Sequence, residues 1–260
     1  MRKENAGTTN YVVSAFFRFM PSGTCLPGPS PHCKKCGSEI VMKNCFLLLS
    51  KPYAMVDYKK PLFTSGDNIW VLPVCTMPDD VKDKSDFELK YSRNGKLSKK
   101  LNDCLIQSGA DETHIHYLNY YRPVDGEIKE NIRTSDYIIL PGGEMSSGYR
   151  RIRTFGLDAI LRDTSATITG ISAGALILFQ EYFITPNWYY KTFSFDTGLG
   201  LLDPDWMIEV HYSSEDEKQN AYLRYVRQIR PQTRIYAIQE TGYLFCHSDG
   251  RLEMKNVTIF

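Results

Sequence analysis

Apolar positions after the first forty residues fall into short continuous runs, separated by longer stretches with helical spacing. Buried strands of a parallel sheet have uninterrupted apolar runs, whereas amphipathic helices repeat at about every 3.6 residues. The runs predict strands at residues 45–49, 69–75, 113–118, 137–140, 166–169, 206–210, 235–238, 243–246 and 252–257. The helical spacing predicts helices at 85–108, with a break at Asn94-Gly95, and at 148–162, 173–182 and 215–230. This alternation predicts an α/β fold with a largely parallel sheet, closed by a hairpin across residues 248–250.

The first 41 residues differ from the rest of the chain. They carry four prolines among glycines and serines, and neither a helical nor a strand period is sustained. We therefore expect an irregular extension at 1–41 and one α/β domain at 42–260. His32, Cys33 and Cys36 could supply half of a zinc site, but no second half follows nearby, so no metal site is predicted.

The strongest candidate for chemistry is a serine between two glycines. The predicted strand 166–169 runs into Gly170-Ile171-Ser172-Ala173-Gly174, and a predicted helix follows at once. A serine at such a corner is held in a tight conformation with its hydroxyl above the sheet edge, and the next backbone N–H can face an oxyanion. We predict Ser172 as the nucleophile and Ala173 as an oxyanion donor. The alternative is a small-residue turn that serves close packing alone.

A second glycine-rich turn follows the predicted strand 137–140. It contains Gly142, Gly143 and Glu144. Ligands of open α/β sheets gather at the carboxyl ends of strands, so this turn should lie beside Ser172. We predict Gly143 as the second oxyanion donor, and Gly142 and Glu144 as substrate-binding residues. An ordinary turn is an equally good interpretation of Gly142 alone.

A serine hydroxyl needs a base, and histidine titrates in the useful range. His211 follows the predicted strand 206–210 and precedes a helix, and we predict it as the base. His247 is the rival, because it would suit an α/β-hydrolase esterase in which the order is serine, acid, histidine.

The third member of such a site is a carboxylate that orients the imidazole. Glu240 is the first candidate, since it follows the predicted strand 235–238 and precedes Thr241-Gly242, a sequence that predicts a turn. Glu181 and Asp196 are alternatives, and each of the three could instead be a solvated surface carboxylate.

Composition narrows the class of protein. Of 260 residues, 42% are hydrophobic and 23% charged, the formal net charge is +1, and there are seven cysteines. A nearly neutral chain is not expected to bind nucleic acid or a membrane surface, and an odd number of scattered cysteines favours a reducing, cytoplasmic location. No apolar stretch reaches the roughly 20 residues that span a bilayer.

These motifs, in this order, resemble the serine dipeptidase E (α-aspartyl dipeptidase) and cyanophycinase group, relatives of the class I glutamine amidotransferase fold. The resemblance covers most of residues 42–260. It is carried by Leu140-Pro141-Gly142-Gly143, Gly156-Leu157, Gly170-Ile171-Ser172-Ala173-Gly174, Gly198-Leu199-Gly200-Leu201-Leu202, Val210-His211-Tyr212 and Ile238-Gln239-Glu240-Thr241-Gly242.

The resemblance implies a flavodoxin-like three-layer sandwich and hydrolysis of a small peptide without a cofactor by Ser172, His211 and a carboxylate. Relatives that release aspartyl residues use arginines shortly after the histidine, but here no arginine occurs before Arg224. Glu144 also stands where relatives often carry an amide. Aspartyl specificity is therefore left open, as are a homodimeric assembly and a non-catalytic binding role that retains the fold.

Overall fold

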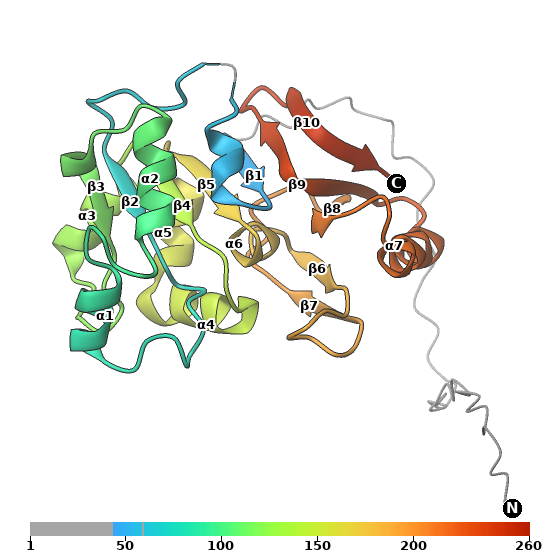
Figure 1. Ribbon diagram of the computed structural model, residues 1–260, viewed down its shortest axis with the longest axis horizontal. Coiled ribbons are helices and arrows are strands. Elements are labelled where there is room, and N and C mark those ends of the chain that lie inside the picture. The colour runs from blue at the N-terminus through green and yellow to red at the C-terminus, as the bar shows by residue number, and fades with distance from the viewer. Residues whose placement is uncertain (1–43, 59) are drawn as a thin grey trace, which may run out of the picture. The chain divides into compact units, whose positions relative to one another are not determined.

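The structure is a computed structural model that describes residues 44–58 and 60–260 (Figure 1). The strands are β1 (Phe46–Leu49), β2 (Ile69–Val71), β3 (Ile115–Tyr117), β4 (Tyr137–Leu140), β5 (Thr167–Ile171), β6 (Glu181–Ile184), β7 (Ser194–Thr197), β8 (Trp206–Tyr212), β9 (Arg234–Cys246) and β10 (Leu252–Ile259). The α-helices are α1 (Lys84–Lys90), α2 (Lys99–Gln107), α3 (Gly126–Arg133), α4 (Met145–Phe155), α5 (Leu157–Asp163), α6 (Ala173–Leu176) and α7 (Glu217–Ile229). Two 3-10 helices are η1 (Pro52–Met55) and η2 (Glu112–His114). The expected extension at 1–41, with His32, Cys33 and Cys36, lies outside the described residues.

The central sheet is mixed but mostly parallel, as predicted. Its order is β10-β9-β1-β5-β4-β2-β3, and β8 also pairs with β9. Strands β1, β5, β4, β2 and β3 run parallel to one another, whereas β9 is antiparallel to both β1 and β10. The predicted hairpin is confirmed, because the Gly250 N–H donates to the His247 carbonyl in the turn between β9 and β10.

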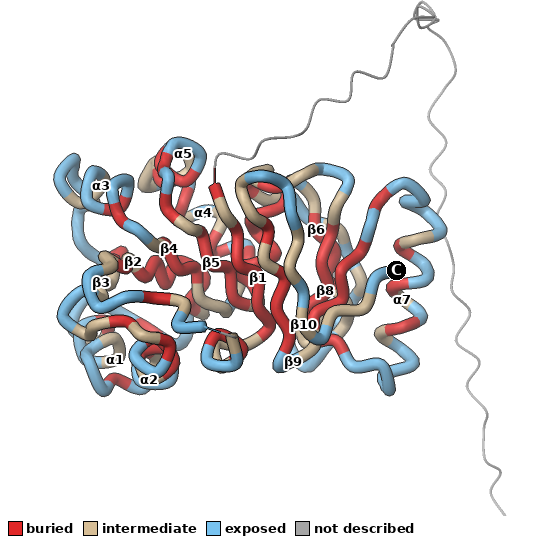
Figure 2. The backbone as a smooth tube through the Cα atoms, turned by 90° about the horizontal axis from the view of Figure 1, so that it is seen from above, coloured by how far each residue is buried: buried red, intermediate tan, exposed pale blue. Residues whose placement is uncertain are grey.

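Helices cover both faces of this sheet (Figure 2). Strand β1 is buried on both of its faces. All four of its residues are buried, and they alternate between two hydrophobic clusters, one on each side of the sheet. Leu48 packs in the cluster that contains Ile152 of α4, and Leu47 packs in the cluster that contains Leu105 of α2. Fully burying one such side chain stabilises the fold by about 1.5–3 kcal/mol. The uninterrupted apolar run thus indicates a strand between two helical layers, which confirms the predicted α/β sandwich.

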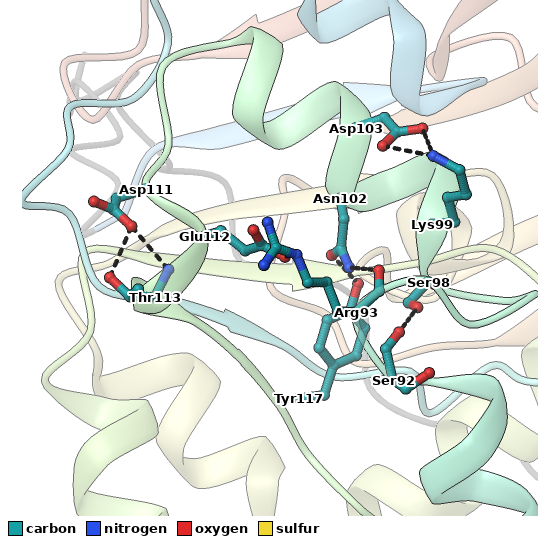
Figure 3. Close-up of polar contacts among 10 residues, drawn as sticks. All are labelled: Ser92, Arg93, Ser98, Lys99, Asn102, Asp103, Asp111, Glu112, Thr113 and Tyr117. Carbon is teal, nitrogen blue, oxygen red and sulfur yellow. Dashed lines mark hydrogen bonds and ion pairs between the residues drawn. The ribbon is translucent and has the colours of Figure 1, made fainter.

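Two of the predicted helices are each divided into two at a glycine. The break expected at Asn94-Gly95 separates α1 from α2, and the loop between them is held where Asn102 donates to the Arg93 carbonyl at 3.0 Å. The Tyr117 hydroxyl donates to the same Asn102 side chain at 2.7 Å (Figure 3). The predicted helix 148–162 is in fact two helices, α4 and α5, that meet at Gly156 with φ 64°. Within the described part of the chain, no helix is long and apolar enough to cross a membrane.

The predicted helix 173–182 is wrong beyond Leu176. The residues that follow do not continue the helical ladder, because their carbonyls bond to a distant segment: the Ile177 carbonyl accepts from the Leu199 N–H at 2.8 Å. The chain then enters β6, which pairs with β7 in a separate two-stranded sheet. Helical spacing of apolar residues cannot distinguish a helix from a buried turn that is satisfied by tertiary partners.

The two strands predicted at 235–238 and 243–246 form one long strand, β9, so the turn expected at Thr241-Gly242 is wrong. The register between β9 and β10 instead shifts opposite this pair. Asn256 adopts φ 51° there, and its amide donates to the Thr241 hydroxyl at 2.9 Å. Glycine and threonine at this position mark a bulge that bends the strand.

This bent strand brings the ends of β1 and β8 together. The first half of β9 pairs with β8, and the second half pairs with the end of β1, where Leu49 lies opposite Tyr243. Because β1 and β8 approach this point from opposite directions, their carboxyl ends meet beside Glu240. Strand β5 lies next to β1 and ends at the same edge of the sheet.

Candidate active site

Ser172 occupies the strained corner between β5 and α6. Its backbone has φ 54° and ψ −119°, a combination that residues other than glycine rarely adopt, and its N–H donates to the Leu49 carbonyl at 2.8 Å. Gly174 is required on packing grounds, since a Cβ there would overlap the Leu140 carbonyl oxygen. The turn therefore forces the serine hydroxyl out of the sheet edge, as the sequence predicts.

His211 lies directly beside this hydroxyl. Its Nε2 is 2.8 Å from Ser172 Oγ, although the two residues are 39 positions apart. The backbone of His211 has φ 57°, and its N–H donates to Ser50 Oγ at 2.9 Å. Ser50 is fully buried and in turn donates to the Ile238 carbonyl at 2.8 Å. One serine hydroxyl thus ties the ends of β1 and β8 to β9 and holds the imidazole in position.

Glu240 completes a continuous chain of hydrogen bonds. Its Oε1 is 2.9 Å from His211 Nδ1, while its Oε2 accepts from the Tyr53 hydroxyl at 3.1 Å and lies 3.9 Å from Lys51 Nζ. Burial, and then the neighbouring Glu240 carboxylate, raises the pKa of Tyr53, so its hydroxyl remains a donor. Two groups besides the histidine therefore orient this carboxylate.

The electrostatic surroundings keep His211 neutral. Burial lowers its pKa from 6.5 and Lys51 lowers it further, while Glu240 acts in the opposite direction. A neutral imidazole that donates from Nδ1 to Glu240 has a free lone pair on Nε2 for the serine proton. The arrangement can therefore perform general-base chemistry near neutral pH.

The alternative residues lie elsewhere. Glu181 is in β6, 3.4 Å from the guanidinium of Arg230, and Asp196 is in β7, in the same small sheet. His247 lies in the β9–β10 turn with Nε2 4.0 Å from Glu253. Within residues 44–58 and 60–260, the carboxylate hydrogen-bonded to His211 is that of Glu240, and neither Glu181 nor Asp196 contacts it. His247 does not line the cavity described below.

The second glycine turn approaches Ser172 as expected. A Cβ on Gly142 would lie 3.0 Å from the Ser172 Cβ, and Gly143, with φ 142°, packs so tightly on Cys75 that a Cβ would overlap the Cys75 carbonyl. Gly143 and Ala173 both line the cavity in front of Ser172. The Glu144 carboxylate is not in that lining. It accepts hydrogen bonds from the hydroxyls of Ser146 and Ser147. Gly142 is also outside the lining, so contacts of Gly142 and Glu144 with a substrate stay predictions.

A cavity of about 1100 Å³ opens in front of the Ser172 hydroxyl. Its walls come from α6, the β6–β7 loop, the end of β8 and the start of α7. Ser172, His211 and Glu240 all line it, together with Glu209, which is not among the residues predicted from the sequence. Glu209 is only 4% exposed, and burial raises its pKa to about 7.

The signal for Glu209 is present in the sequence. A carboxylate inside the apolar run 206–210 is unusual, because ionisable side chains are rarely fully buried outside functional sites. Ser50 and Tyr53 have no such signal, because their role depends on where β1 ends relative to β8. No cluster of metal-ligating side chains occurs within the part of the chain that the structure describes.

Comparison with known proteins gives one family match and similar solved structures. Residues 92–253 match the profile of peptidase family S51, well over half of the chain. A solved structure from Listeria monocytogenes EGD-e, assigned as a peptidase E protein, has a TM-score of 0.57 at 17% identity and covers 83% of this chain and 99% of its own. At that identity, the likeness supports the fold alone.

A second solved structure is a peptidase from an acI-B1 actinobacterium, with a TM-score of 0.45 at 13% identity, covering 85% of this chain and 89% of its own. No curated protein matches the sequence. The profile match, together with the α/β fold, shows that the chain belongs to peptidase family S51 and is a serine-type peptidase.

Proposed function

We propose that the protein hydrolyses small peptides with a catalytic triad formed by Ser172, His211 and Glu240. The observation that carries this proposal is the unbroken chain of hydrogen bonds, 2.8 Å from the serine oxygen to the imidazole and 2.9 Å from the imidazole to the carboxylate. Nucleophile, base and orienting group within hydrogen-bond reach of one another are what acyl transfer requires.

In the first step, Ser172 Oγ attacks the carbonyl carbon of the peptide bond, and its proton moves to His211 Nε2. The imidazolium is stabilised by Glu240, whose Oε1 lies 2.9 Å from Nδ1. When the tetrahedral intermediate collapses, the C–N bond breaks and His211 returns the proton to the leaving amine. Water, deprotonated by the same imidazole, then attacks the ester and releases the acid and the free serine.

The negatively charged oxygen of each tetrahedral intermediate must be stabilised by hydrogen-bond donors. The backbone N–H groups of Gly143 and Ala173 are the candidates, since both residues line the cavity beside Ser172. One well-placed donor contributes about 3 kcal/mol to lowering the barrier. Their role remains a prediction that rests on this position.

The shape of the cavity supports a small peptide as the substrate. Its volume of about 1100 Å³ is slightly above the range of about 300–1,000 Å³ that is usual for small-molecule sites, and holds a short peptide. Residues of the β6–β7 loop line one side of it, which supports a short ligand rather than an extended chain. Dipeptides and slightly longer peptides are therefore the substrates that we propose.

The test is a dipeptide screen with the purified chain, in which the released amine is measured. Wild-type protein should hydrolyse at least one dipeptide, and Ser172→Ala should reduce turnover by at least about 10⁴-fold. The exposed Ser214 provides a matched control, since Ser214→Ala should retain wild-type turnover. Full peptide hydrolysis by folded Ser172→Ala would show that the proposed nucleophile is wrong.

A further inference from the structure

Glu209 is a buried carboxylate in the cavity that has no part in the proposed catalytic steps. We infer that its carboxylate binds a cationic group of the substrate, an ammonium or a guanidinium, beside the reacting serine. The inference extends the proposed function, because it names the charge of the peptide that the same cavity accepts.

The first observation is the pairing of the Glu209 carboxylate. Oε1 accepts from Thr185 Oγ1 at 2.6 Å and from Gln219 Nε2 at 2.5 Å. For Oε2 the structure records no donor within residues 44–58 and 60–260, although the side chain is only 4% exposed. Thr185, the residue after β6, and Gln219 in α7 therefore hold one oxygen and leave the other for a ligand.

The second observation is the position of this carboxylate. Glu209 lines the same cavity as Ser172 and stands two residues before His211 on β8. Two residues of chain span at most about 7 Å, so Glu209 and His211 are no farther apart along the backbone than about two residues of an extended peptide. A peptide whose carbonyl faces Ser172 can thus place a nearby positive charge at Glu209.

The cavity as a whole favours a positive ligand. Its lining contains four carboxylates and two lysines, and no arginine lines it in the described part of the chain. One of those lysines, Lys51, lies 3.9 Å from Glu240 and is therefore already near a negative partner. A substrate carboxylate, as in an aspartyl peptide, would find few unpaired cations here and would face Glu209.

Aromatic side chains complete the environment. The β6–β7 loop presents Trp188, Tyr189 and Tyr190 to the cavity, and the Asn187 side chain fixes this loop by accepting from the two tyrosine N–H groups at 2.9 Å. Trp188 is 82% exposed, which leaves its ring available for contact. Aromatic faces attract ammonium and guanidinium groups, so this wall complements the buried carboxylate.

Burial explains why a ligand should be cationic rather than merely polar. The pKa of Glu209, near 7, shows that removal from water penalises its charged form. A cation at Oε2 would supply the partner that the ionised carboxylate lacks. Binding would then convert an unfavourable buried charge into a charge-assisted hydrogen bond.

The experiment compares p-nitroanilides that separate the two sources of positive charge. Lysyl and N-acetyl-lysyl substrates carry a side-chain ammonium, alanyl carries only the α-ammonium, N-acetyl-alanyl carries neither, and aspartyl adds a negative charge. In wild-type protein, kcat/KM should be higher for at least one of the two cation-bearing classes than for N-acetyl-alanyl, and lower for aspartyl than for alanyl, which carries the same α-ammonium without the carboxylate.

Glu209→Gln keeps the shape of the side chain and removes the charge. It should lower kcat/KM for the preferred cationic substrate by about 10- to 100-fold, mainly through KM, and leave N-acetyl-alanyl within about 2-fold. Retained turnover of N-acetyl-alanyl also reports that the variant is folded. Glu209→Asp, which keeps the charge, should restore part of the loss, and Glu215→Gln, the same change at an exposed residue outside the cavity, should have no effect. A uniform loss for all substrates, or no loss, would overturn the inference.

Binding without turnover separates this inference from the proposed reaction. If wild-type protein cleaves none of these compounds, calorimetry on Ser172→Ala with lysyl-alanine and N-acetyl-lysyl-alanine still tests Glu209. Binding that weakens by about 10-fold or more in the Ser172→Ala, Glu209→Gln double variant would support the cationic site even though the hydrolysis failed. Equal binding by both proteins would overturn it.

Discussion

Replacing Glu209 by glutamine should change how the stability of the fold depends on pH. The carboxyl is 4% exposed, and its pKa is raised to about 7 from an ordinary value of 4.5. The folded protein therefore binds this proton more tightly than the unfolded chain does. Glutamine has the same shape, accepts the same hydrogen bonds from Thr185 and Gln219, and does not titrate.

The magnitude follows from the difference between the two pKa values. At about 1.4 kcal/mol for each unit, a rise from 4.5 to about 7 corresponds to about 3 kcal/mol. Because the folded pKa is the higher one, the contribution of Glu209 to stability is fully present below pH 4.5 and is lost as pH rises through 7. Between pH 5 and pH 8, wild-type protein should lose about 2–3 kcal/mol that the glutamine variant keeps.

The assay is urea unfolding of both proteins at pH 5, 6, 7 and 8. The free energy of unfolding of Glu209→Gln, relative to wild type, should rise steadily across this range. Glu215→Gln removes an exposed carboxylate and should show no such trend. A difference between Glu209→Gln and wild type that stays constant with pH would refute the reasoning, since it would mean that the buried carboxyl titrates alike in the folded and unfolded states.

Three further predictions concern the catalytic residues. Glu240→Gln should lower kcat by on the order of 10²- to 10⁴-fold with little change in KM, because the imidazole loses the group that holds its tautomer, and steady-state kinetics on the best dipeptide measures this. Since the pKa of His211 is lowered below 6.5, kcat/KM for N-acetyl-alanyl p-nitroanilide, which carries no cation for Glu209, should stay high at pH 6.5 and fall only at more acidic pH, and a pH profile of this substrate with a midpoint above 6.5 would contradict the burial argument. Ser50→Ala should cost about 1–3 kcal/mol in urea unfolding, because the His211 N–H and the Ile238 carbonyl both lose a buried partner, and an unchanged unfolding free energy would argue against this tie.

Much of the fold follows from local patterns. The run Phe46–Leu49 is apolar without interruption and is buried on both faces, so its assignment as a buried strand needed no tertiary information. The tight turn at Ser172 could also be predicted from local sequence, because the strand, the glycines and the following apolar residues are adjacent in the chain. These features depend on spacing that the sequence displays directly.

Other features depend on contacts that spacing does not reveal. The segment after Leu176 has helical spacing, but its carbonyls bond to residues near Leu199. Thr241-Gly242 is a sequence typical of turns, but in the structure it lies in β9, where the pairing with β10 shifts register at a bulge. In both cases a distant segment supplies the hydrogen bonds that decide the local conformation.

The residues of the candidate site also divide into those that local sequence predicts and those that depend on distant contacts. His211 and Glu240 were predicted because each belongs to a motif next to a strand, and the structure brings both to Ser172. Ser50 and Tyr53 were missed because their part in the site arises from the meeting of β1, β8 and β9. Glu209 was missed even though a carboxylate in an apolar strand is a visible signal.

The most direct test of the central claim is reaction of the folded protein with a fluorophosphonate, followed by mass mapping of the modified residue. Activation of Ser172 by His211 predicts one covalent adduct on Ser172 in wild-type protein, and no adduct in His211→Ala at the same reagent concentration and time. An unmodified Ser172 in folded wild-type protein, or equal labelling of Ser172 after His211 is removed, would contradict it.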